Sequence, residues 1–495
     1  MNDHPRLCTA TLDRLPHGVA RPSYDRATLA TGIVHLGIGA FHRAHQAVYT
    51  DSVLAMGDRR WGILGASLRS ADTCDALAPQ DGLYGLAVRD AAGERLQVVG
   101  SVTRLAVAPE DPDALIAAMA APDTHIVSLT VTEKGYCHRP ATGALDEDHP
   151  DVRHDLAHPE APRSAPGFIV EALRRRRAAG LTPFTALCCD NLPHNGATLR
   201  RVLVRFAALR DPDLGRYVEG ELRCPSTMVD RIVPATTDAD RARVADALGL
   251  ADAWPIMTEP FTQWVIEDDF AGPRPAWDAA GATFVQDVAP YELAKLRLLN
   301  GSHSTLAYLG YLAGHETVSD TMAAPGFAAL VEALMRDEAA PTLPPVPGLD
   351  VSDYAASLLA RFRNPALQHR TWQIAMDGSQ KLPQRLLGTV RDRLVAGQPF
   401  GRLALGIAAW MRYVTGRDER GEAIDVRDPL AADLRARTAP CTTAEALIDA
   451  CLGVQAVFGT DLPAEPAFRS AVGVALAALL QHGAAKVVAE FQHPA

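Results

Sequence analysis

The stretch IVHLGIGAFHRAHQAVYTDSVLAMG (33–57) decides the fold of the first half of this chain. Its first part, IVHLGIG (33–39), has the apolar character of a buried β-strand that runs into glycines. The residues that follow have apolar side chains at helical spacing. A strand, a glycine turn and a helix in this order are typical of the unit that opens a dinucleotide-binding fold.

The turn between strand and helix carries the chemistry of such a unit. Gly37 and Gly39 allow a tight turn and a close approach of the backbone to a pyrophosphate, and the following helix offers free N–H groups. We assign these glycines to the cofactor site, together with Ala40, Phe41 and His42 at the start of the helix. His42 occupies the position of the third glycine of the full motif, so an ordinary strand–helix turn is the alternative.

Short apolar runs continue to alternate with helical stretches up to about residue 285. Runs with strand character are WGILGASL (61–68), LQVVGSV (96–102), HIVSLTVTEKGY (125–136) and FTALCCDNL (184–192). Stretches of helical period lie between them, at 111–120 and 167–180. This alternation predicts an α/β fold with a parallel, doubly wound sheet of Rossmann type, in an N-terminal domain of residues 1–285.

After about Pro290 the strand signals fade and helical periodicity takes over. The helical stretches are 291–314, 325–339, 353–362, 384–397, 402–416 and 467–489. The proline-rich segment TLPPVPGLD (342–350) predicts a loop among them. We therefore predict a mostly α-helical C-terminal domain over residues 286–495, which would hold the substrate.

Composition narrows the class of partner. The chain has 495 residues, and 48 Lys and Arg against 59 Asp and Glu give a formal charge of −11, so there is no general attraction to nucleic acid or to an anionic membrane. The N-terminus has no apolar signal segment, and no apolar run has the length of a membrane span. Eight cysteines without a CxxC pair indicate reduced thiols and a cytoplasmic location. A small-molecule partner fits, in a monomer or a small homo-oligomer.

The end of the second predicted strand should carry the residue that contacts the adenosine ribose. An acid at this place favours NAD, and a base can favour NADP. Arg69 and Asp72 both occur there, in SLRSADTCD, so both nucleotides remain open and NAD is our first choice. The alternative for both side chains is simple solvation at the surface.

Metal binding is not predicted. His42 and His45 are three residues apart and could share one helix face. A zinc site needs further ligands at suitable spacing, and none stands out. We expect these histidines to pack or hydrogen-bond around the nucleotide.

A second set of polar residues lies in AKLRLLNGSHS, within a predicted helix. On an ideal α-helix Lys295, Asn300 and His303 fall within an arc of roughly 140°, so one face can aim an amine, an amide and an imidazole into one cleft. A buried lysine can act as a general base towards an alcohol, and an amide can donate to a developing alkoxide. The NG pair within this helix is locally unfavourable, which hints at a functional reason.

Two loops after predicted strands add candidates. Asn191, in CDNLPHNG (189–196), could supply a second amide, although Asn, Pro and Gly also make ordinary turns. Glu133, in VTEKGYC (131–137), could relay a proton or be a solvated loop acid. Tyr291-x-x-x-Lys295 matches the YxxxK pair of short-chain reductases, but those enzymes are about half this length and use a different glycine pattern, so we set that interpretation aside.

Six stretches together resemble one family: GIVHLGIGAFHRAHQAVYTD, SLTVTEKGYC, CDNLPHNG, MVDRIVP, EPFTQWVIEDDF and KLRLLNGSHSTLAYLGYL. They resemble the polyol-specific long-chain dehydrogenases, the family of the mannitol dehydrogenases and the fructuronate reductases. The resemblance implies a zinc-independent enzyme that transfers a hydride to or from NAD. It also implies Lys295 as general base, Glu133 as proton-relay acid, a substrate contact from Asp230, and Asn191, Asn300 and His303 around the reacting oxygen.

The stretch NPALQHRTWQIAMDGSQKLPQRLL (364–387) most resembles fructuronate reductases, because mannitol 2-dehydrogenases tend to have arginine in place of Gln373. A uronate carries a carboxylate that fructose and mannitol lack, and its site requires fixed cations. Arg370, Lys381 and Arg385 are three cations in a short span, although the two arginines could instead lie on outer helix faces. We therefore predict interconversion of D-fructuronate and D-mannonate, with Gln373 also at the substrate.

Two alternatives remain. The chain could be a mannitol 2-dehydrogenase or another polyol dehydrogenase of the same family. It could also be a nucleotide-binding protein without catalysis, although the complete set of Lys295, Asn300, His303 and Asn191 argues against that class.

Overall fold

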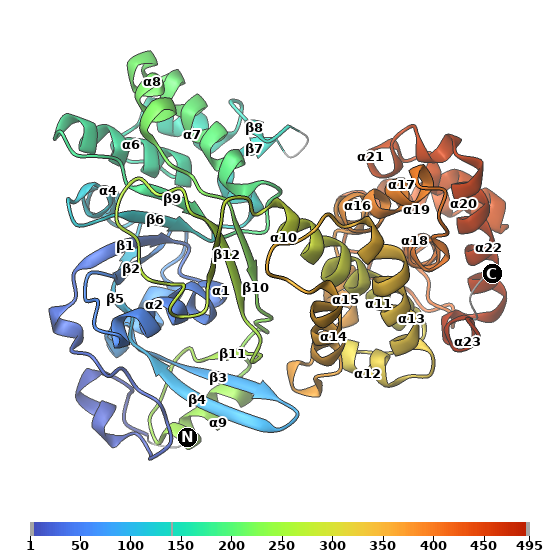
Figure 1. Ribbon diagram of the computed structural model, residues 1–495, viewed down its shortest axis with the longest axis horizontal. Helices are drawn as coiled ribbons and strands as arrows, with labels where there is room; N and C mark the ends of the chain where they lie inside the picture. The colour runs from blue at the N-terminus through green and yellow to red at the C-terminus, as the bar shows by residue number, and fades with distance from the viewer. Residues whose placement is uncertain (1–3, 140–141, 492–495) are drawn as a thin grey trace. The chain divides into compact units, whose positions relative to one another are not determined.

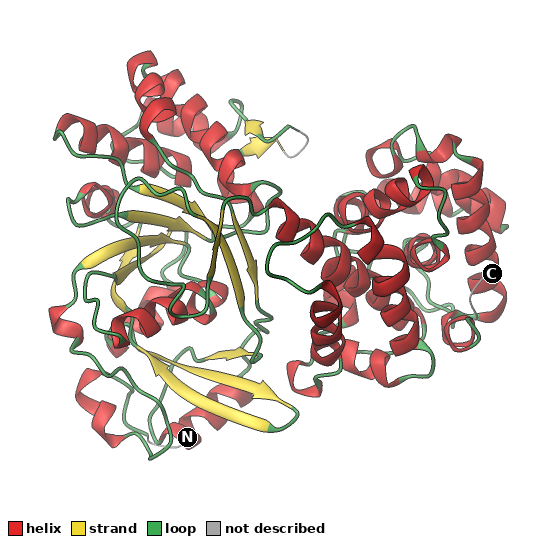
Figure 2. Cartoon of the chain, viewed as in Figure 1, coloured by secondary structure: helices red, strands yellow, loops and turns green. Residues whose placement is uncertain are grey.

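The computed structural model describes residues 4–139 and 142–491, and the chain forms two compact units, Met1–Ala289 and Pro290–Ala495. All strands of the described residues belong to the first unit (Figure 1). The second unit consists of helices and loops over the residues described (Figure 2). This division agrees with the point at which the strand signals of the sequence fade.

The first unit is built on a parallel sheet of five strands in the order β5-β2-β1-β6-β9. The strands are β1 (Thr31–Leu36), β2 (Gly62–Ser67), β5 (Val102–Val107), β6 (Ile126–Leu129) and β9 (Thr185–Cys188). The chain moves outwards from β1 to β2 and β5, then returns to the other side of β1 with β6 and β9. The direction of winding therefore reverses between β1 and β6, which confirms the predicted doubly wound sheet.

Both faces of this sheet are covered by apolar side chains. Ile33 of β1 belongs to a cluster with α2 (Gln46–Ala55), whereas Val34 and Leu36 face a second cluster. That second cluster includes residues of α4 (Pro112–Ala120), α6 (Ala165–Ala178) and α7 (Asn195–Arg210). Because successive side chains of a strand point to opposite faces, a strand buried on both faces has an unbroken apolar sequence.

Smaller elements complete the first unit. Its short helices are α1 (Ala40–Ala44), α3 (Asp72–Leu77), α5 (Pro150–Ala157), α8 (Pro212–Glu221) and α9 (Asp238–Leu248). One three-stranded sheet has β11 (Ile256–Thr258), β3 (Tyr84–Asp90) and β4 (Gly93–Val99), and another has β10 (Thr227–Asp230), β12 (Gln263–Glu267) and β13 (Thr283–Val285). A two-stranded hairpin joins β7 (His138–Arg139) to β8 (Ala144–Leu145).

Two predicted strands are shorter or more broken than expected. The run 96–102 belongs to two different sheets, because β4 ends at Val99 and β5 begins at Val102. The backbone N–H of Gly100 donates to Asp51 Oδ1 at 2.8 Å, and Ser101 Oγ donates to the carbonyl of Ala47 at 2.7 Å, so helix α2 holds the chain at this corner. The run 125–136 leaves the sheet after Leu129, and a 3-10 turn, Glu133–Tyr136, follows.

The second unit contains helices that surround two buried ones. The buried helices are α11 (Gly301–Leu312) and α18 (Gly401–Tyr413), which pack closely where a Cβ on Gly406 would meet Thr305 Oγ1 at 2.6 Å. The others are α10 (Ala289–Ala294), α12 (Val318–Ala323), α13 (Phe327–Ala333), α14 (Val351–Phe362), α15 (Thr371–Ala375), α16 (Gly378–Leu382), α17 (Gly388–Val395), α19 (Ala431–Thr438), α20 (Ala444–Leu452), α21 (Gln455–Phe458), α22 (Pro466–His482) and α23 (Ala484–Ala489). The predicted loop follows a 3-10 turn, Ala340–Thr342, and lacks helix and strand up to Asp350.

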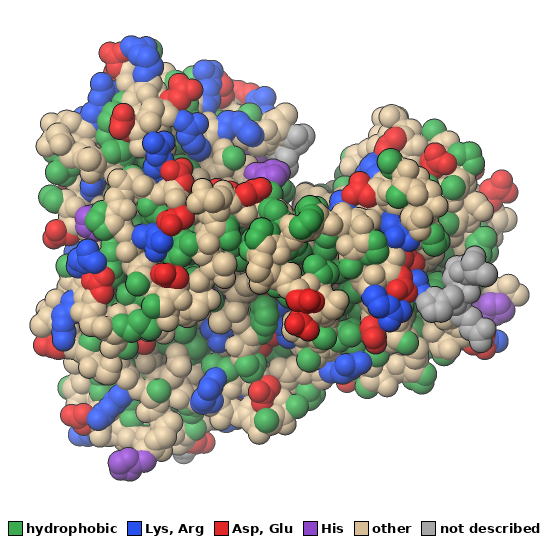
Figure 3. Space-filling view, viewed as in Figure 1, with side chains coloured by type: hydrophobic (Ala, Val, Ile, Leu, Met, Phe, Trp, Pro, Cys, Tyr) green, Lys and Arg blue, Asp and Glu red, His purple; other side chains and the backbone are tan. Residues whose placement is uncertain are grey.

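The surface is mixed in charge on the face that Figure 3 shows, where Lys and Arg side chains are interspersed with Asp and Glu. That face offers a ligand no extended field of one sign. None of the described helices combines the length and apolarity required to cross a membrane. The eight cysteines all lie within the described residues and are free thiols.

A buried carboxylate holds the start of α18. Glu338 is 3% exposed and accepts hydrogen bonds from the backbone N–H groups of Arg402 and Leu403, both at 2.9 Å. The Arg402 guanidinium also donates to it at 3.2 Å. Removal of this carboxylate would take an acceptor from two helix N–H groups and from the buried Arg402, which also pairs with Asp337 at 3.6 Å.

We predict that Glu338→Ala lowers the free energy of unfolding by about 3 kcal/mol, because a buried ion pair loses one partner. Urea denaturation followed by circular dichroism measures the change. Glu332→Ala is the matched control, since Glu332 is half-exposed and pairs with Arg336 at 3.8 Å, and we expect it to cost less than about 0.5 kcal/mol. Equal effects of the two substitutions would contradict the role given to Glu338.

Candidate active site

A cavity of about 250 Å³ lies at the carboxyl ends of the central strands. Its walls come from the glycine turn after β1, from Ser67–Ser70 after β2 and from Thr130–Thr132 after β6. Segments from the start of α5 and α6 close the far side. In a doubly wound sheet this is the edge, and the reversal point, at which ligands bind.

The glycine turn fits a group that needs close backbone approach. Gly37 has a φ of +96°, which only glycine adopts readily, and a Cβ at this residue would collide with the carbonyl of Thr130. A Cβ on Gly39 would have no neighbour closer than 3.9 Å, so this residue lies open towards the cavity. Gly37 therefore fixes the turn and Gly39 leaves space beside it, as a bound pyrophosphate requires.

Buried histidines pack against the glycine turn, and one of them hydrogen-bonds to it. His35 Nε2 lies 3.1 Å from the carbonyl of Gly37 and 2.8 Å from Thr130 Oγ1. The ring of His42 stacks on His35 with centroids 3.4 Å apart, and both side chains are fully buried. His45 contacts the carbonyl of Gln263 at 2.9 Å. Both histidines therefore pack within the first unit and His45 hydrogen-bonds there, and their predicted place around the nucleotide stays a prediction.

The residues after β2 differ in their relation to the cavity. Arg69 lines it, and its positive charge opposes the burial that raises the pKa of Cys137 to about 12. Asp72 is exposed in the first turn of α3 and is not among the lining residues. Ala40 and Phe41 begin α1 directly after the glycine turn and are half-buried. Of the two charged residues after β2, only the cation Arg69 lines the cavity.

Two loops at the same edge are joined by Asp190. Its carboxylate accepts hydrogen bonds from the backbone N–H groups of Val131 at 2.9 Å and Thr132 at 3.1 Å, and from the Tyr136 hydroxyl at 2.6 Å. Burial raises the pKa of Asp190, and these hydrogen bonds act in the opposite direction. Sequence analysis did not single out Asp190, although it lies in the CDN segment that carried Asn191.

Asp190 fixes the segments that carry two predicted catalytic residues. Asn191 is the next residue, in an exposed position after β9, and Glu133 is exposed at the start of the 3-10 turn that ends at Tyr136. The side chain of Asn195 closes the first loop by donating to the carbonyls of Asp190 and Thr227, at 3.0 and 2.8 Å. Asp230 is buried at the end of β10, and β10 begins at Thr227.

In the second unit, the helix that carries the predicted base is not a regular α-helix. Residues Lys295–Asn300 form a π-helical turn between α10 and α11. Hydrogen bonds from i to i+5 widen the turn, so residues five apart lie closer to one face than the 140° expected from ideal α-geometry. Lys295 is 8% exposed and Asn300 is half-buried at the two ends of this turn. Such π turns occur frequently at functional sites.

His303 lies one turn further along, in α11. Its ring stacks on Phe362 with centroids 5.3 Å apart and meets the ring of His369 edge-on at 4.7 Å. Burial lowers the pKa of His303 well below its usual value, and the nearby charges of His369, Arg385, Arg361 and Lys381 lower it further. At neutral pH this imidazole is uncharged, and its buried Nε2 has no hydrogen-bond partner among the described residues.

The predicted cations separate into two groups. Arg385 Nη1 donates to Ser304 Oγ at 3.1 Å, and Lys381 Nζ donates to the carbonyl of Met376 at 2.6 Å, so both lie beside the His303 segment. Arg370 instead forms an ion pair with Glu316 at 2.6 Å on the surface. Gln373 is exposed on α15.

Two residues near this cluster, Arg361 and His369, were missed by sequence analysis. Arg361 is 7% exposed at the end of α14, and His369 has a pKa lowered to about 4 by burial and then by Lys381. Gly301 explains the unfavourable NG pair, because its Cβ would meet the carbonyl of Arg385 at 2.8 Å. The glycine thus permits the close approach of the π-helical segment Pro383–Leu387, which carries Arg385.

The Tyr291 hydroxyl donates a hydrogen bond to the carbonyl of Pro347, which gives this tyrosine a structural role.

Comparison with known proteins assigns both units. Residues 31–279 match the model of the mannitol dehydrogenase Rossmann domain, and residues 287–480 match the mannitol dehydrogenase C-terminal domain. D-mannonate oxidoreductase of Escherichia coli is 49% identical over 95% of this chain and 98% of its own, and the uncharacterized oxidoreductase YeiQ of the same organism is also 49% identical, over 95% and 96%. The ternary complex of Pseudomonas fluorescens mannitol 2-dehydrogenase with NAD and D-mannitol superimposes with a TM-score of 0.87, at 40% identity over 98% of both chains.

The Rossmann-type sheet and the match of both units to the mannitol dehydrogenase domains define a two-domain dehydrogenase that acts on a CH–OH group. The chain belongs to the mannitol dehydrogenase family.

The neutral state of His303 predicts a pH-dependent stability. In the unfolded chain this histidine binds a proton near pH 6.5, whereas the folded protein excludes it, so stability is full above that pH and is lost as the pH falls. Between pH 7.5 and 5.5 the wild type should lose on the order of 1 kcal/mol more than His303→Leu does. Urea denaturation at the two pH values measures this difference.

Phe362→Leu is the matched control, because it removes the ring stacked on His303 and keeps the imidazole. It should destabilise the protein equally at both pH values. If His303→Leu and the wild type showed the same pH dependence, the imidazole would not be uncharged in the folded state.

Proposed function

We propose that this protein is an NAD-dependent fructuronate reductase, which interconverts D-fructuronate and D-mannonate without a catalytic metal. The observation that carries the proposal is the cluster in which Lys381 and Arg385 lie beside the uncharged His303. Two cations near a neutral imidazole suit a substrate with both a hydroxyl and a carboxylate. The 49% identity to E. coli D-mannonate oxidoreductase over nearly the full length supports the same substrate.

The nucleotide would bind in the cavity at the carboxyl edge of the sheet, where Gly37, Gly39 and Arg69 lie. Bound NAD supplies the acceptor or donor of the hydride at the carbinol carbon. NAD is our choice because the P. fluorescens mannitol 2-dehydrogenase complex contains it. The cation at Arg69, with Asp72 outside the lining, makes NADP the second possibility.

Lys295 takes the proton from the substrate hydroxyl in oxidation and returns it in reduction. Asn300 and Asn191 donate amide N–H groups to the oxygen as it becomes an alkoxide, and the neutral His303 contributes a hydrogen bond to the same oxygen. Glu133 passes the proton to solvent, for which its exposed position is suitable. Asp230 orients a further substrate hydroxyl.

The carboxylate of the substrate is held by Lys381 and Arg385. Arg370 can join them only if its ion pair with Glu316 opens, and Gln373 contributes at most an amide hydrogen bond. A mannitol 2-dehydrogenase activity is the second candidate, favoured by the 40% identity to the P. fluorescens enzyme. A cytoplasmic location and a monomer or small homo-oligomer complete the proposal.

Replacement of the base tests the mechanism. We predict that Lys295→Ala lowers turnover by roughly 10²–10⁴-fold, because the proton transfer loses its catalyst, while the affinity for NADH stays unchanged. Stopped-flow loss of NADH absorbance and NADH fluorescence titration measure the two quantities. Lys486→Ala removes an exposed lysine from α23 and serves as control. Unchanged turnover in Lys295→Ala would overturn the assignment of the base.

The cation cluster predicts substrate choice. With D-fructuronate, Arg385→Leu should lower kcat/KM by roughly 10–150-fold, since a charge-assisted hydrogen bond contributes about 1.5–3 kcal/mol. With D-fructose the same variant should change kcat/KM much less, because no carboxylate is present. Arg370→Leu is the control, and its ion pair with Glu316 predicts a small effect on both substrates.

Side-by-side NADH oxidation with the two ketoses measures these values. A wild type that prefers D-fructose, or an Arg385→Leu variant that loses activity equally on both substrates, would contradict the carboxylate site. The first of these results would favour the mannitol-type activity.

A further inference from the structure

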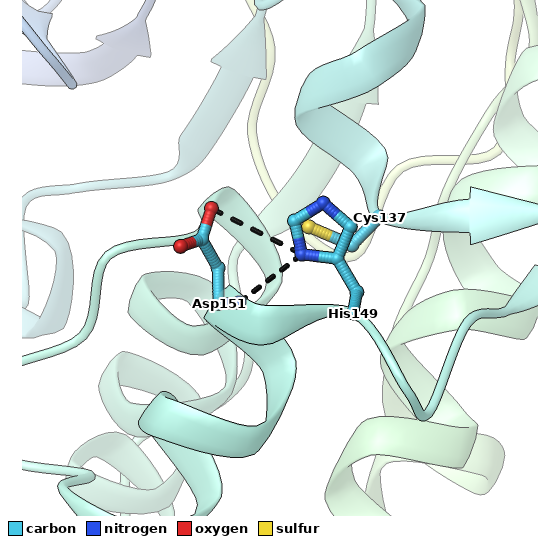
Figure 4. Close-up of side chains that lie close together, drawn as sticks. All are labelled: Cys137, His149 and Asp151. Carbon is cyan, nitrogen blue, oxygen red and sulfur yellow. Dashed lines mark hydrogen bonds and ion pairs between the residues drawn. The ribbon is translucent and has the colours of Figure 1, made fainter.

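A group of three metal-ligating side chains lies at the edge of the nucleotide cavity. Cys137, His149 and Asp151 each offer one ligand atom, and these atoms all lie within 4.8 Å of one another. Figure 4 shows the three side chains turned towards one another, from the end of a 3-10 turn and the start of α5. Cys137 is buried and the other two are half-buried.

The fold brings these residues together although twelve positions separate Cys137 from His149. The β7–β8 hairpin returns the chain, and the backbone N–H of Asp146 donates to the carbonyl of Cys137 at 2.8 Å. His149 then caps α5, where its Nδ1 accepts from the backbone N–H of Asp151 at 3.2 Å and lies 4.0 Å from Asp151 Oδ2. Backbone contacts therefore hold Cys137 and His149 in place. An ion bound to Nδ1 of His149 would replace the hydrogen bond from the Asp151 N–H, because that nitrogen has one lone pair.

The donor set suits a borderline-soft divalent cation. Zinc combines thiolate, imidazole and carboxylate ligands, and a site with three protein ligands keeps a fourth position for water or another ligand. A thiolate and a carboxylate balance the double charge of the ion. Bond lengths of about 2.0–2.3 Å place the ligand atoms of a tetrahedral ion roughly 3.3–3.8 Å apart, so side-chain movements of about 1 Å close the present cluster onto an ion.

The surroundings have charges of both signs. Asp151 and Asp155 favour the protonated thiol of Cys137 and would favour a cation, whereas Arg69 acts in the opposite direction. Binding of the ion would displace the thiol proton, as in other thiolate sites. Asp155 is not itself a ligand, because its carboxylate accepts from Ser164 Oγ and from two backbone N–H groups.

We propose that Cys137, His149 and Asp151 bind one zinc ion, and that this ion and the dinucleotide exclude one another. Cys137 and Asp151 line the same cavity as Gly37, Gly39 and Arg69, so an ion held by them would border the space that the nucleotide needs. The ion is an inhibitor and takes no part in hydride transfer. The exclusion rests on the proposed nucleotide function, whereas zinc binding by the three residues does not.

Zinc binding is tested on the full-length protein after treatment with EDTA and removal of the chelator. Competition with a chromophoric chelator gives the zinc affinity and stoichiometry, and Co²⁺ in place of Zn²⁺ gives a thiolate charge-transfer absorption. We expect one equivalent in the wild type. Cys137→Ser, His149→Gln and Asp151→Asn should each weaken binding by roughly 100-fold, and Cys137→Ser should abolish the Co²⁺ band.

Matched controls are Cys441→Ser and His158→Gln, which lie outside the cluster and should bind zinc as the wild type does. Circular dichroism of each metal-free variant shows that it is folded, and the conservative Asp151→Asn carries the test if Cys137→Ser does not fold. Equal zinc affinity in the wild type and all three ligand variants would overturn the site.

Exclusion is tested by NADH fluorescence titration with and without Zn²⁺. Zinc should weaken NADH binding by the wild type at least tenfold and should leave NADH binding by His149→Gln unchanged. Zinc bound by the three residues without an effect on NADH would overturn the exclusion. A metal-free wild type that fails to bind NADH would instead refute the proposed function, and the chelator competition would still decide the metal site.

Discussion

The carboxylate of Asp190 is the constraint on which the carboxyl edge of the sheet depends. Asp190 lies directly after β9 and accepts hydrogen bonds from two backbone N–H groups and one hydroxyl of the loop after β6. Parallel strands leave such loops side by side but do not fix their shape. By joining them, Asp190 gives Asn191 and Glu133 defined positions, and it also shapes the wall of the cavity at Val131 and Thr132.

The conformation of the glycine turn depends on contacts at the same carboxyl edge of the sheet. Gly37 can approach the carbonyl of Thr130 only because it lacks a Cβ, and His35 links the turn to Thr130 through a side-chain contact at 2.8 Å. The rings of His35 and His42 stack on one another and pack beside the glycine turn. Burial lowers the pKa of His35 to about 3, so its ring stays neutral. A charged imidazole there would bear the cost of burial away from water.

In the helical unit, a small residue again permits a close approach of two segments. Gly301 lets the segment of Arg385 approach α11, and the π turn from Lys295 to Asn300 ends directly before it. The result is a group of cations around an uncharged imidazole, within a buried environment where charges interact strongly. Such an arrangement suits the anionic substrate of the proposed function and would supply a hydrogen bond without adding a further charge.

Sequence patterns were sufficient for the architecture. The alternation of apolar runs and helical stretches predicted the doubly wound sheet and the helical second half. A strand buried on both faces is an unbroken apolar run, and a helix buried on one face repeats its apolar residues at helical spacing. The glycine turn was recognisable for another local reason, because the positive φ of Gly37 requires glycine. Periodicity failed at 96–102, where a corner at Gly100 divides one apolar run between two sheets.

Local sequence thus determined the fold class, the turn and the residue types of the site. Tertiary structure alone decided which of those side chains meet. It set Arg370 against Glu316 and brought Arg361, which the sequence did not mark, beside His303. It also joined Asp190 to the loop of Glu133 and gathered Cys137, His149 and Asp151 at one cavity. These contacts connect residues far apart in the chain, and neither spacing nor periodicity records the distances between them.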